Sequence, residues 1–285
     1  MIAEIGGNRF EWGARTYVMG IVNVTPDSFS GDGLGGDVDA AVEQGVRMAS
    51  EGADMIDVGG ESTRPGHVPV TAAEEIARTE TVVRRLARGS GVPVSIDTYK
   101  EEVAEAGIAA GATILNDVWG LTRSPGIAVL AARSGSGLVL MHNQDGTEYS
   151  GDLMEEIKRF LAAATARAIA AGVPKERVII DPGIGFGKTA EQNWEVMRRL
   201  DELKEVGQPI LVGTSRKSFI GKLLDLPVTD RLEGTTATVV GAVLRGADIV
   251  RVHDVKQMVR AVRVADHMRR PGRHSGRRPG HQSGR

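Results

Sequence analysis

Short, mostly apolar runs alternate with longer amphipathic stretches along most of the chain. The runs are apolar at successive residues instead of at every second one, which is typical of parallel strands buried on both faces. Glycine-led triplets at 52–54, 111–113 and 246–248 each close a helical stretch and open an apolar run. The pattern predicts eight strands, at residues 17–24, 55–59, 93–97, 112–117, 137–142, 177–181, 209–213 and 248–253.

Helical periodicity fills the segments between these runs. Asp39 is expected to cap the first helix, and Thr71 with Glu74 has the spacing of a capping box at the second. Gly111 is expected to end the third helix. The predicted helices span residues 40–51, 72–88, 100–110, 125–133, 153–171, 190–206, 231–245 and 255–268, and a short extra helix spans 218–225.

Eight strand-then-helix units over about 250 residues predict an α/β fold, a (β/α)₈ TIM barrel. An open doubly wound sheet is the alternative, although it usually has fewer strands in one layer. Residues 1–15 precede the first strand and are expected to cap the bottom of the barrel. Because no linker interrupts the alternation, residues 1–268 are predicted to form a single domain.

Charge is spread unevenly along the 285 residues. The whole chain has 35 basic and 37 acidic side chains, a formal net charge of −2. Residues 269–285 contain six arginines and no acid, so residues 1–268 carry −8 by themselves. The end segment is too poor in apolar residues to offset the entropy of ordering, and is predicted to be a disordered basic tail. The acidic body and an aromatic content of 4% argue against nucleic acid as the main ligand.

Composition excludes several further classes of protein. Cysteine is absent, which excludes disulfides, thiolate metal sites and a cysteine nucleophile. No apolar run approaches the roughly 18 residues of a membrane span, and residues 1–17 lack the apolar core of a signal peptide; a cytoplasmic location without membrane association is therefore expected. The glycine-rich stretch 183–189 fails both nucleotide-binding patterns, because Pro182 and Lys188 stand where those patterns need glycine.

Every predicted strand ends in a polar residue or is followed closely by one. In a TIM barrel the carboxyl ends of the strands form the active site, so these side chains are expected to converge on one mouth. A single Asp or Asn after a strand is often only a turn former or a helix cap, but eight in a row make a purely structural reading hard to sustain. The set is Asn23, Glu61, Asp97, Asn116 with Asp117, His142, Asp181, Ser215 with Lys217, and Arg251 with His253.

The charges in this set fall into two groups. Asp97 and Asp181 follow the third and sixth strands, across the mouth from each other, and two buried carboxylates need donors or a cation between them. A planar heterocycle with an amidine-like pair of N–H groups would supply those donors, and Asn116 could contact the same ring edge. The basic group follows strands seven and eight, the usual phosphate position of this fold: Arg216, Lys217, Arg251 and His253.

Two neighbouring residues complete this prediction. Arg64, after the second strand, could reach the phosphate position. Asn23 offers an amide oxygen suited to a Mg²⁺ ion that keeps waters and phosphate oxygens as its other ligands. The residues alone therefore predict a ring held in the barrel mouth and a phosphate ester at its rim.

Seven motifs in this order resemble the dihydropteroate synthase family over residues 19–264. They read MGIVNVTPDSFSGDG (19–33), DVGGESTRPG (57–66), SIDTYK (95–100), NDVWG (116–120), DPGIGFGK (181–188), LVGTSRKSFIG (211–221) and RVHDV (251–255). The resemblance implies a transferase that joins 6-hydroxymethyl-7,8-dihydropterin diphosphate to p-aminobenzoate, giving 7,8-dihydropteroate and diphosphate with Mg²⁺ as cofactor. It also implies a homodimer formed through helices away from the active site, and a target for sulfonamides.

Roles for individual residues follow from the resemblance at matching positions. The implied pterin-binding residues are Asp97, Asn116, Met141, Asp181, Phe186 and Lys217. The implied p-aminobenzoate-binding residues are Thr63, Arg64, Pro65, Phe186 and Ser218. The implied diphosphate-binding residues are Asn23, Thr63, Arg64, Arg251 and His253, with Asn23 also the metal ligand. The implied catalytic residues are Asp97, Lys217, Arg251 and His253.

One departure from the family pattern concerns the first loop. The family's acid commonly follows Ser30 directly, whereas here Gly31 intervenes and the acid is Asp32. The roles of Asp27 and Asp32 are therefore left open, and His67 has no clear role. Two alternatives remain: a methyltetrahydrofolate–corrinoid type of methyltransferase, which has no diphosphate to bind, and a non-catalytic pterin-binding paralogue. Schiff-base aldolase chemistry is disfavoured, because no lysine ends a strand.

Overall fold

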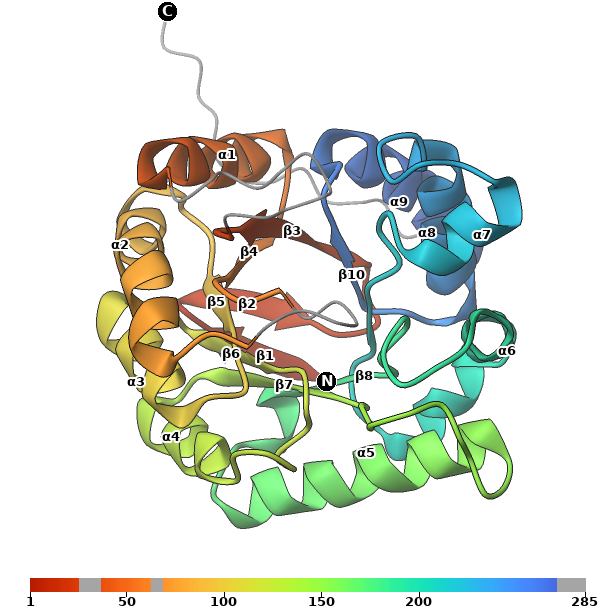
Figure 1. Cartoon of the computed structure of the whole chain (residues 1–285), viewed down its shortest axis with the longest axis horizontal. Coiled ribbons are helices and arrows are strands. Elements are labelled where there is room, and N and C mark those ends of the chain that lie inside the picture. The colour runs from red at the N-terminus through yellow and green to blue at the C-terminus, as the bar shows by residue number, and fades with distance from the viewer. Residues whose placement is uncertain (26–36, 63–68, 271–285) are drawn as a thin grey trace, which may run out of the picture.

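The computed structural model describes residues 1–25, 37–62 and 69–270. Eight parallel strands form the centre of the molecule, and helices surround them (Figure 1). The strands are β3 (Tyr17–Asn23), β4 (Met55–Gly59), β5 (Val94–Asp97), β6 (Ile114–Asp117), β7 (Gly137–Met141), β8 (Val178–Asp181), β9 (Leu211–Val212) and β10 (Ile249–Val252). Their order around the sheet is β8-β7-β6-β5-β4-β3-β10-β9.

The sheet closes between its first and last strands. Ile180 on β8 forms a parallel bridge with Ile210, just before β9, and the backbone N–H of Ile180 donates to the carbonyl of Pro209 at 2.9 Å. Closure leaves no edge strand in the main sheet, which distinguishes a barrel from an open doubly wound sheet. The predicted TIM barrel is therefore confirmed, and each of the eight predicted strands is present with its ends shifted by at most two residues.

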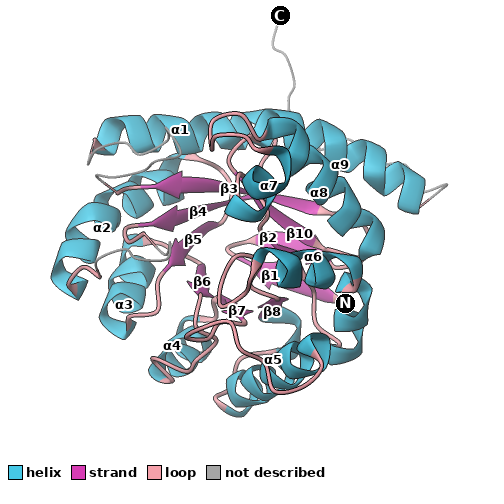
Figure 2. Ribbon diagram, turned by 45° about the vertical axis from the view of Figure 1, so that its right-hand side comes forward, coloured by secondary structure: helices cyan, strands magenta, loops and turns pink. Residues whose placement is uncertain are grey.

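Helices cover the outside of the barrel, as Figure 2 shows for the ring of cyan ribbons around the magenta strands. They are α1 (Val38–Glu51), α2 (Ala72–Gly89), α3 (Glu101–Ala110), α4 (Gly126–Ser134), α5 (Leu153–Ala170), α6 (Ala190–Arg198), α7 (Ser218–Leu224), α8 (Leu232–Arg245) and α9 (Val255–Arg269). Within the described residues, none of them combines the length and apolarity needed to cross a membrane.

The helix ends test three sequence expectations. The Thr71 side chain accepts the backbone N–H of Glu74, which is one half of the predicted capping box, while the Glu74 carboxylate accepts from Arg78. Gly111 ends α3 with a φ of 112°, as predicted. The first cap was wrong: α1 begins two residues earlier, and Asp37 accepts the N–H of Ala40. Asp39 instead lies in the first turn and pairs with Arg85 on α2, where a carboxylate is still favourable to the helix dipole.

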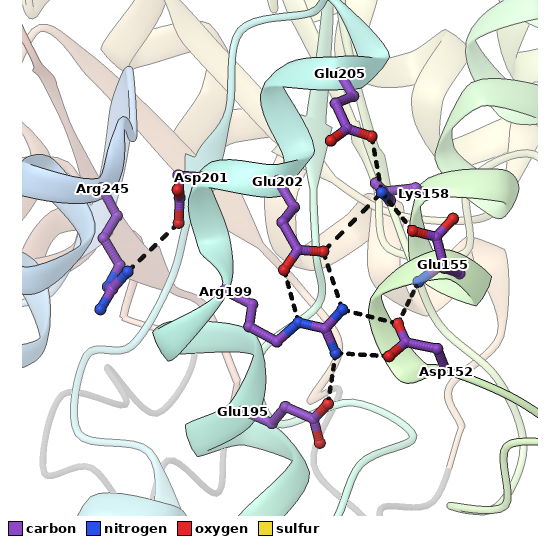
Figure 3. A network of polar contacts seen from close by, with 9 residues as sticks. All are labelled: Asp152, Glu155, Lys158, Glu195, Arg199, Asp201, Glu202, Glu205 and Arg245. Carbon is purple, nitrogen blue, oxygen red and sulfur yellow. Dashed lines mark hydrogen bonds and ion pairs between the residues drawn. The ribbon is translucent and has the colours of Figure 1, made fainter.

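The predicted helix 190–206 is broken at Arg199. Here α6 ends, and a 3₁₀ helix (Leu200–Val206) follows. The Arg199 guanidinium pairs with Glu195 before the break, Glu202 after it and Asp152 at the start of α5 (Figure 3). Lys158 on α5 reaches the same segment through Glu205 at 2.8 Å. These long-range pairs hold the second half against α5, an effect that local helical periodicity cannot show.

A β-hairpin closes the amino-terminal end of the barrel. It consists of β1 (Ile2–Ile5) and β2 (Asn8–Glu11), paired antiparallel. Its buried side chains and Trp12 form one apolar cluster with the inward-facing residues of the strands: Ala3, Ile5, Phe10, Tyr17, Met19, Met55, Ile114, Val139, Ile179, Leu211 and Ile249. The expected bottom cap is confirmed.

The carboxyl-terminal helix extends one residue beyond its predicted end. Arg269 donates to the carbonyls of Val243 at 3.0 Å and Ala247 at 3.3 Å, and Arg270 pairs with Asp266. The first two residues of the predicted tail are thus held by helix contacts. Residues 271–285 of that tail lie outside the described residues.

Candidate active site at the carboxyl ends of the strands

Every second residue of each strand points into the barrel, because side chains alternate between the two faces of a sheet. At the hairpin end these inward positions are apolar and belong to the cluster described above. Two or four residues further along the same rows, most inward positions become polar or glycine. They are Asn23, Asp57, Gly59, Asp97, Asn116, Met141, Asp181, Gly213, Arg251 and His253. The strand register places these positions side by side: Asn23 is paired with Gly59, Gly59 with Asp97, and Asp97 with Asn116.

Arg251 lies at the centre of this set. Its Nε donates to Asp57 Oδ2 and its Nη2 donates to Asp97 Oδ2, both at 2.6 Å. Asn116 Nδ2 also donates to Asp57 Oδ2, at 3.1 Å. The fully buried Asp57 carboxylate therefore joins Asn116, assigned to the ring, with Arg251, assigned to the diphosphate, and Arg251 in turn contacts Asp97.

Asp57 was missed as a candidate site residue. The motif containing it was recognised, but no role was assigned to this position. A signal was present: a carboxylate stands in the middle of the otherwise apolar strand Met55–Gly59. Because an isolated buried charge is strongly unfavourable, such a residue almost always has a partner of opposite charge or a functional ligand.

The two carboxylates are incompletely satisfied within the part of the chain that the structure describes. Oδ1 of Asp57 and Oδ1 of Asp97 are buried and accept no hydrogen bond there. Burial raises the pKa of Asp97 to about 7, against the opposing attraction of Arg251, and the charge of Asp57 adds to the rise. Buried oxygens of this kind are usually paired with donors, so the mouth fits a ligand that carries several N–H groups.

Asp181 and Lys217 form the opposite side of the mouth. Burial raises the pKa of Asp181, while its Oδ1 accepts the backbone N–H of Gly183 at 2.7 Å. Burial also lowers the pKa of Lys217 to about 8. The Lys217 ammonium donates to the carbonyl of Ile184 and lies 4.7 Å from the centre of the Phe186 ring. A cation and an aromatic face thus stand beside the second carboxylate.

A buried lysine holds the loop that carries Phe186. Lys188 Nζ donates to the carbonyls of Gly183 at 3.1 Å and Phe186 at 3.0 Å, and lies 2.9 Å from Nδ1 of His142. Burial lowers the pKa of Lys188 to about 7 and that of His142 to about 3. The glycine-rich stretch is therefore a compact turn built around the amine of Lys188.

His253 and Asn23 complete the set of residues at the mouth. His253 accompanies Ser215, whose Oγ lies 2.9 Å from the imidazole Nδ1 and 3.1 Å from the backbone nitrogen. A methyl group built on Gly59 would lie 3.8 Å from both Asn23 Oδ1 and Asp97 Oδ2. Asn23 therefore shares the space next to the carboxylates. Among the described residues, no three His, Asp or Glu side chains gather in a way that could hold a metal ion.

Four of the polar residues predicted at the mouth face elsewhere. Glu61 pairs with Lys100 and accepts Tyr99 Oη at 2.9 Å. Asp117 accepts the backbone N–H groups of Trp119 and Leu121, so it shapes the turn after β6. His142 packs its ring against Tyr149 and Phe160. Arg216 pairs with Asp254.

The expected convergence of all strand-end polar groups was therefore wrong for these four. Asp117 and His142 come one residue after an inward position, and the strict alternation turns them outward. Ser218 starts α7 and Met141 ends β7. The predicted residues Thr63, Arg64, Pro65 and His67, and the acids Asp27 and Asp32, lie outside the described residues.

Comparison with known proteins decides which family this geometry belongs to. A family model described as "Pterin binding enzyme" matches residues 19–253. A dihydropteroate synthase of Clostridium beijerinckii is 51% identical over 264 residues, covering 92% of this chain and 98% of the relative. That of Bacillus subtilis is 46% identical and covers 90% of both chains. The chain belongs to the dihydropteroate synthase family.

Solved structures of this family agree with the fold. The dihydropteroate synthase of Clostridium difficile, solved in the presence of pteroic acid, is 50% identical with a TM-score of 0.87, and the match covers 91% of this chain and 98% of that one. The enzyme of Xanthomonas albilineans with 4-aminobenzoic acid is 42% identical with a TM-score of 0.88, covering 94% and 98%. The resemblance inferred from the seven motifs is confirmed.

Proposed function

We propose that this chain condenses 6-hydroxymethyl-7,8-dihydropterin diphosphate with p-aminobenzoate to give 7,8-dihydropteroate and diphosphate. Membership of the dihydropteroate synthase family supports the reaction. The observation that carries it is the position of Arg251, whose guanidinium joins two buried carboxylates at the barrel mouth and stands beside the predicted anion residues. One group thus connects a site for N–H donors with a site for phosphate oxygens.

The proposed pterin site uses the carboxylates and their neighbours. Asp97 and Asp181 would accept N–H groups of the ring, and Asn116 would contact its edge. The oxygen Oδ1 of Asp97, buried without a partner in the described part of the chain, suits this task. Lys217 and Phe186 would bind beside the ring, with Met141 as an apolar contact at the end of β7. Asp57 would hold Arg251 and Asn116 in place.

The proposed diphosphate site lies on the side of Arg251 and His253. Arg251 uses two of its N–H groups on Asp57 and Asp97, and its planar fork has further donors for phosphate oxygens. The p-aminobenzoate site would include Phe186 and Ser218, at the start of α7, together with Thr63, Arg64 and Pro65, as the sequence predicts. The proposed reaction begins with cleavage of the bond between the pterin CH₂ and the diphosphate oxygen.

The electron-rich ring can carry the positive charge that develops as this bond breaks. Asp97 would favour the cationic ring, while Arg251 and His253 would stabilise the negative charge on the leaving oxygen. The amine of p-aminobenzoate then forms the new C–N bond and loses one proton. Its neutral form is already nucleophilic, so positioning contributes more than a strong base would.

One residue at the mouth, Asn23, suits the Mg²⁺ cofactor that the family resemblance predicts. Asn23 supplies an amide oxygen next to Asp97, and a single neutral protein ligand suits an ion that arrives with phosphate oxygens and waters. Asn23 would hold the ion, which would neutralise charge on the leaving diphosphate. All other roles above belong to side chains of this chain.

A direct assay tests the proposal. Purified protein is mixed with Mg²⁺, p-aminobenzoate and the dihydropterin diphosphate, and both dihydropteroate and diphosphate are measured. Equal amounts of the two products support the proposed reaction. Pterin binding without turnover would instead identify a non-catalytic paralogue, and methyl transfer from methyltetrahydrofolate would identify the corrinoid type of methyltransferase. Either outcome would reject the proposed reaction.

The homodimer expected from the family has a candidate surface in the described residues. A groove of about 340 Å³ lies between α6, α7 and α8, lined by Trp194, Ile220, Ala237 and other residues. Leu223 is 65% exposed beside it, and Leu224 and Leu244 are also exposed. Apolar groups gathered on one face favour an interface. Light scattering of the native protein and of Leu223→Lys tests it: a dimer that weakens in the variant is expected.

The cytoplasmic location and the disorder of the basic tail stay predictions. The substrates proposed here are small molecules, which agrees with the expectation that nucleic acid is not the main ligand. The domain boundary at residue 268 is proposed to lie close to Arg270, because the last helix extends to Arg269.

A further inference from the structure

Ser215 lies in the loop after β9 and touches His253, which follows β10. The serine is buried, with 6% of its surface exposed. Its Oγ accepts the backbone N–H of His253 at 3.1 Å and lies 2.9 Å from Nδ1 of the same residue. One hydroxyl thus contacts both the main chain and the ring of a residue assigned to the diphosphate.

The hydrogen of this hydroxyl has one acceptor within the part of the chain that the structure describes. A serine hydroxyl donates one hydrogen bond and accepts two. The backbone N–H of His253 fills one of the two acceptor positions of Oγ, and Nδ1 is the acceptor within reach of the hydroxyl hydrogen in the described residues, so both groups are satisfied when the hydroxyl donates to Nδ1. An imidazole that accepts at Nδ1 carries its hydrogen on Nε2 when it is neutral. The contact therefore favours the neutral tautomer with its hydrogen on Nε2.

The loop that carries Ser215 is held in place by the next residue. Arg216 has a φ of 58°, a left-handed conformation that residues other than glycine rarely adopt. Its guanidinium makes two hydrogen bonds to Asp254, at 2.7 and 3.1 Å, so successive residues of the two loops pair twice. Its backbone N–H donates to Thr235 Oγ1 at 3.0 Å, and its carbonyl accepts from Arg231 at 2.9 Å.

These contacts explain why Arg216, with its left-handed backbone conformation, does not face the mouth. The left-handed residue turns its own side chain toward Asp254 while Ser215 and Lys217, on either side of it, face the mouth. These contacts of Arg216 keep the turn from relaxing. The hydroxyl of Ser215 is consequently held at a fixed place relative to β10.

We propose that Ser215 is a positioning residue that fixes the ring orientation and the Nε2–H tautomer of His253, so that the imidazole presents a hydrogen-bond donor to the leaving diphosphate. The inference deepens the proposed function and rests on it for the identity of the anion. The hydrogen on Nε2 of His253 is present before any substrate binds, so it can be observed in the protein alone. Phosphate oxygens are acceptors, so a ring that presented an unprotonated nitrogen would repel them.

The first test reads the tautomer without any substrate. ¹⁵N NMR of histidine-labelled protein at about pH 8, where an ordinary imidazole is neutral, distinguishes a protonated from an unprotonated ring nitrogen. The His253 signals are assigned by their loss in His253→Gln. The expected result is an unprotonated Nδ1 and a protonated Nε2 in the native protein, and a mixture of tautomers in Ser215→Ala. A protonated Nδ1 in the native protein would overturn the inference.

The second test measures the functional consequence. Removing the partner that orients a functional imidazole typically costs about 10- to 100-fold. In Ser215→Ala we expect kcat and the affinity for inorganic diphosphate with Mg²⁺ to fall by about tenfold or more, while KM for p-aminobenzoate stays near that of the native protein. Ser215→Thr, which keeps the hydroxyl, should restore most of the loss. A kcat in Ser215→Ala equal to that of the native protein would contradict the proposal.

A matched control separates this role from a general effect on folding. Ser136→Ala removes another buried serine hydroxyl, which contacts Ser134 at the amino-terminal end of β7. It should leave the His253 spectrum, kcat and diphosphate affinity unchanged. If the native protein forms no dihydropteroate, the proposed reaction fails; the spectrum and diphosphate binding still decide the role of Ser215.

Discussion

Replacing Asp97 by asparagine tests the central electrostatic feature of the mouth. The substitution keeps the shape of the side chain and an oxygen that can accept from Arg251 Nη2, the donor now 2.6 Å from the carboxylate. It removes one negative charge next to the proposed pterin ring. Arg251 keeps Asp57 as a charged partner, so the guanidinium is not left unpaired. We expect a folded barrel with a slow reaction.

The size of the effect follows from the burial of the site. Two unit charges about 4 Å apart interact by about 4 kcal/mol at an effective dielectric constant of about 20. If the ring carries between half and all of a positive charge in the transition state, the loss of Asp97 removes about 2 to 4 kcal/mol of stabilisation. At about 1.4 kcal/mol per factor of ten, kcat should fall by about 30- to 1000-fold.

Stability should respond in the opposite sense. The pKa of Asp97 is raised to about 7 in the folded protein, whereas an aspartate in an unfolded chain titrates near 3.9. Between about pH 4 and pH 7 the folded state therefore holds a proton that the unfolded state has lost, and the native protein loses stability as the pH rises. Asp97→Asn has no such proton, so it should gain stability relative to the native protein across this window.

Two measurements check these expectations. Single-turnover formation of dihydropteroate gives the chemical rate, and urea denaturation at pH 4 to 8 gives the stability. Asp248→Asn is the matched control: Asp248 is a buried carboxylate just before β10, at the hairpin end of the barrel, where it accepts the backbone N–H groups of Gly13 and Ile210, so the loss of its charge should leave kcat near the native value. A folded Asp97→Asn enzyme with a rate within about threefold of native would refute the proposed role of Asp97.

Three further substitutions test other parts of the structure. Gly183→Ala should destabilise the barrel strongly, because φ is +70° and the new methyl carbon would lie 1.9 Å from the carbonyl oxygen of His142. Gly146→Ala, with a φ of +79° and no atom within 4 Å, should cost only about 1–2 kcal/mol. A Tm for Gly183→Ala that is no lower than that of Gly146→Ala would contradict this reasoning. Lys188→Met should remove a pH dependence of stability, because the pKa of Lys188 is lowered to about 7 in the folded state and is about 10.4 in an unfolded chain. The native protein should therefore gain stability relative to the variant as the pH rises from about 7 to about 10. Urea denaturation that shows no such gain would contradict the burial of this amine. Phe10→Ala should lower the free energy of unfolding by about 3–5 kcal/mol with kcat unchanged, because Phe10 packs at the hairpin end; a large loss of kcat in folded protein would contradict the separation of the two ends.

Local sequence patterns were sufficient for the barrel and for most of the strand-end residues of the site. Continuous apolar runs predicted eight buried parallel strands, and all eight are present. The signals for Thr71 and Gly111 are short-range, since a cap or a stop depends on residues within one turn. Asp97, Asn116 and Asp181 could be selected as candidates because the strand ends form the active site in this fold, and the structure places them at the mouth.

Other features depend on contacts between residues far apart in the chain. The helix predicted at 190–206 breaks at Arg199, and this arginine pairs with Asp152, 47 positions earlier. Arg216 was grouped with the phosphate-binding cations, but its pairing with Asp254 turns it away from the mouth. The partners of Arg199 and Arg216 could not be identified from the sequence, because the chain offers several acidic residues that could pair with each arginine.

The sequence by itself determined the order of elements, the eightfold barrel, the family and the chemical types of residue at the mouth, because these depend on local periodicity and on motifs that are contiguous in the chain. The tertiary structure alone decided which side chains meet. It placed Arg251 between Asp57 and Asp97, which lie 194 and 154 positions away, and it turned Asp117 outward beside the inward Asn116. The physical reason is that strand register fixes the direction of each side chain in steps of two residues, while barrel closure brings distant strand ends within hydrogen-bonding distance.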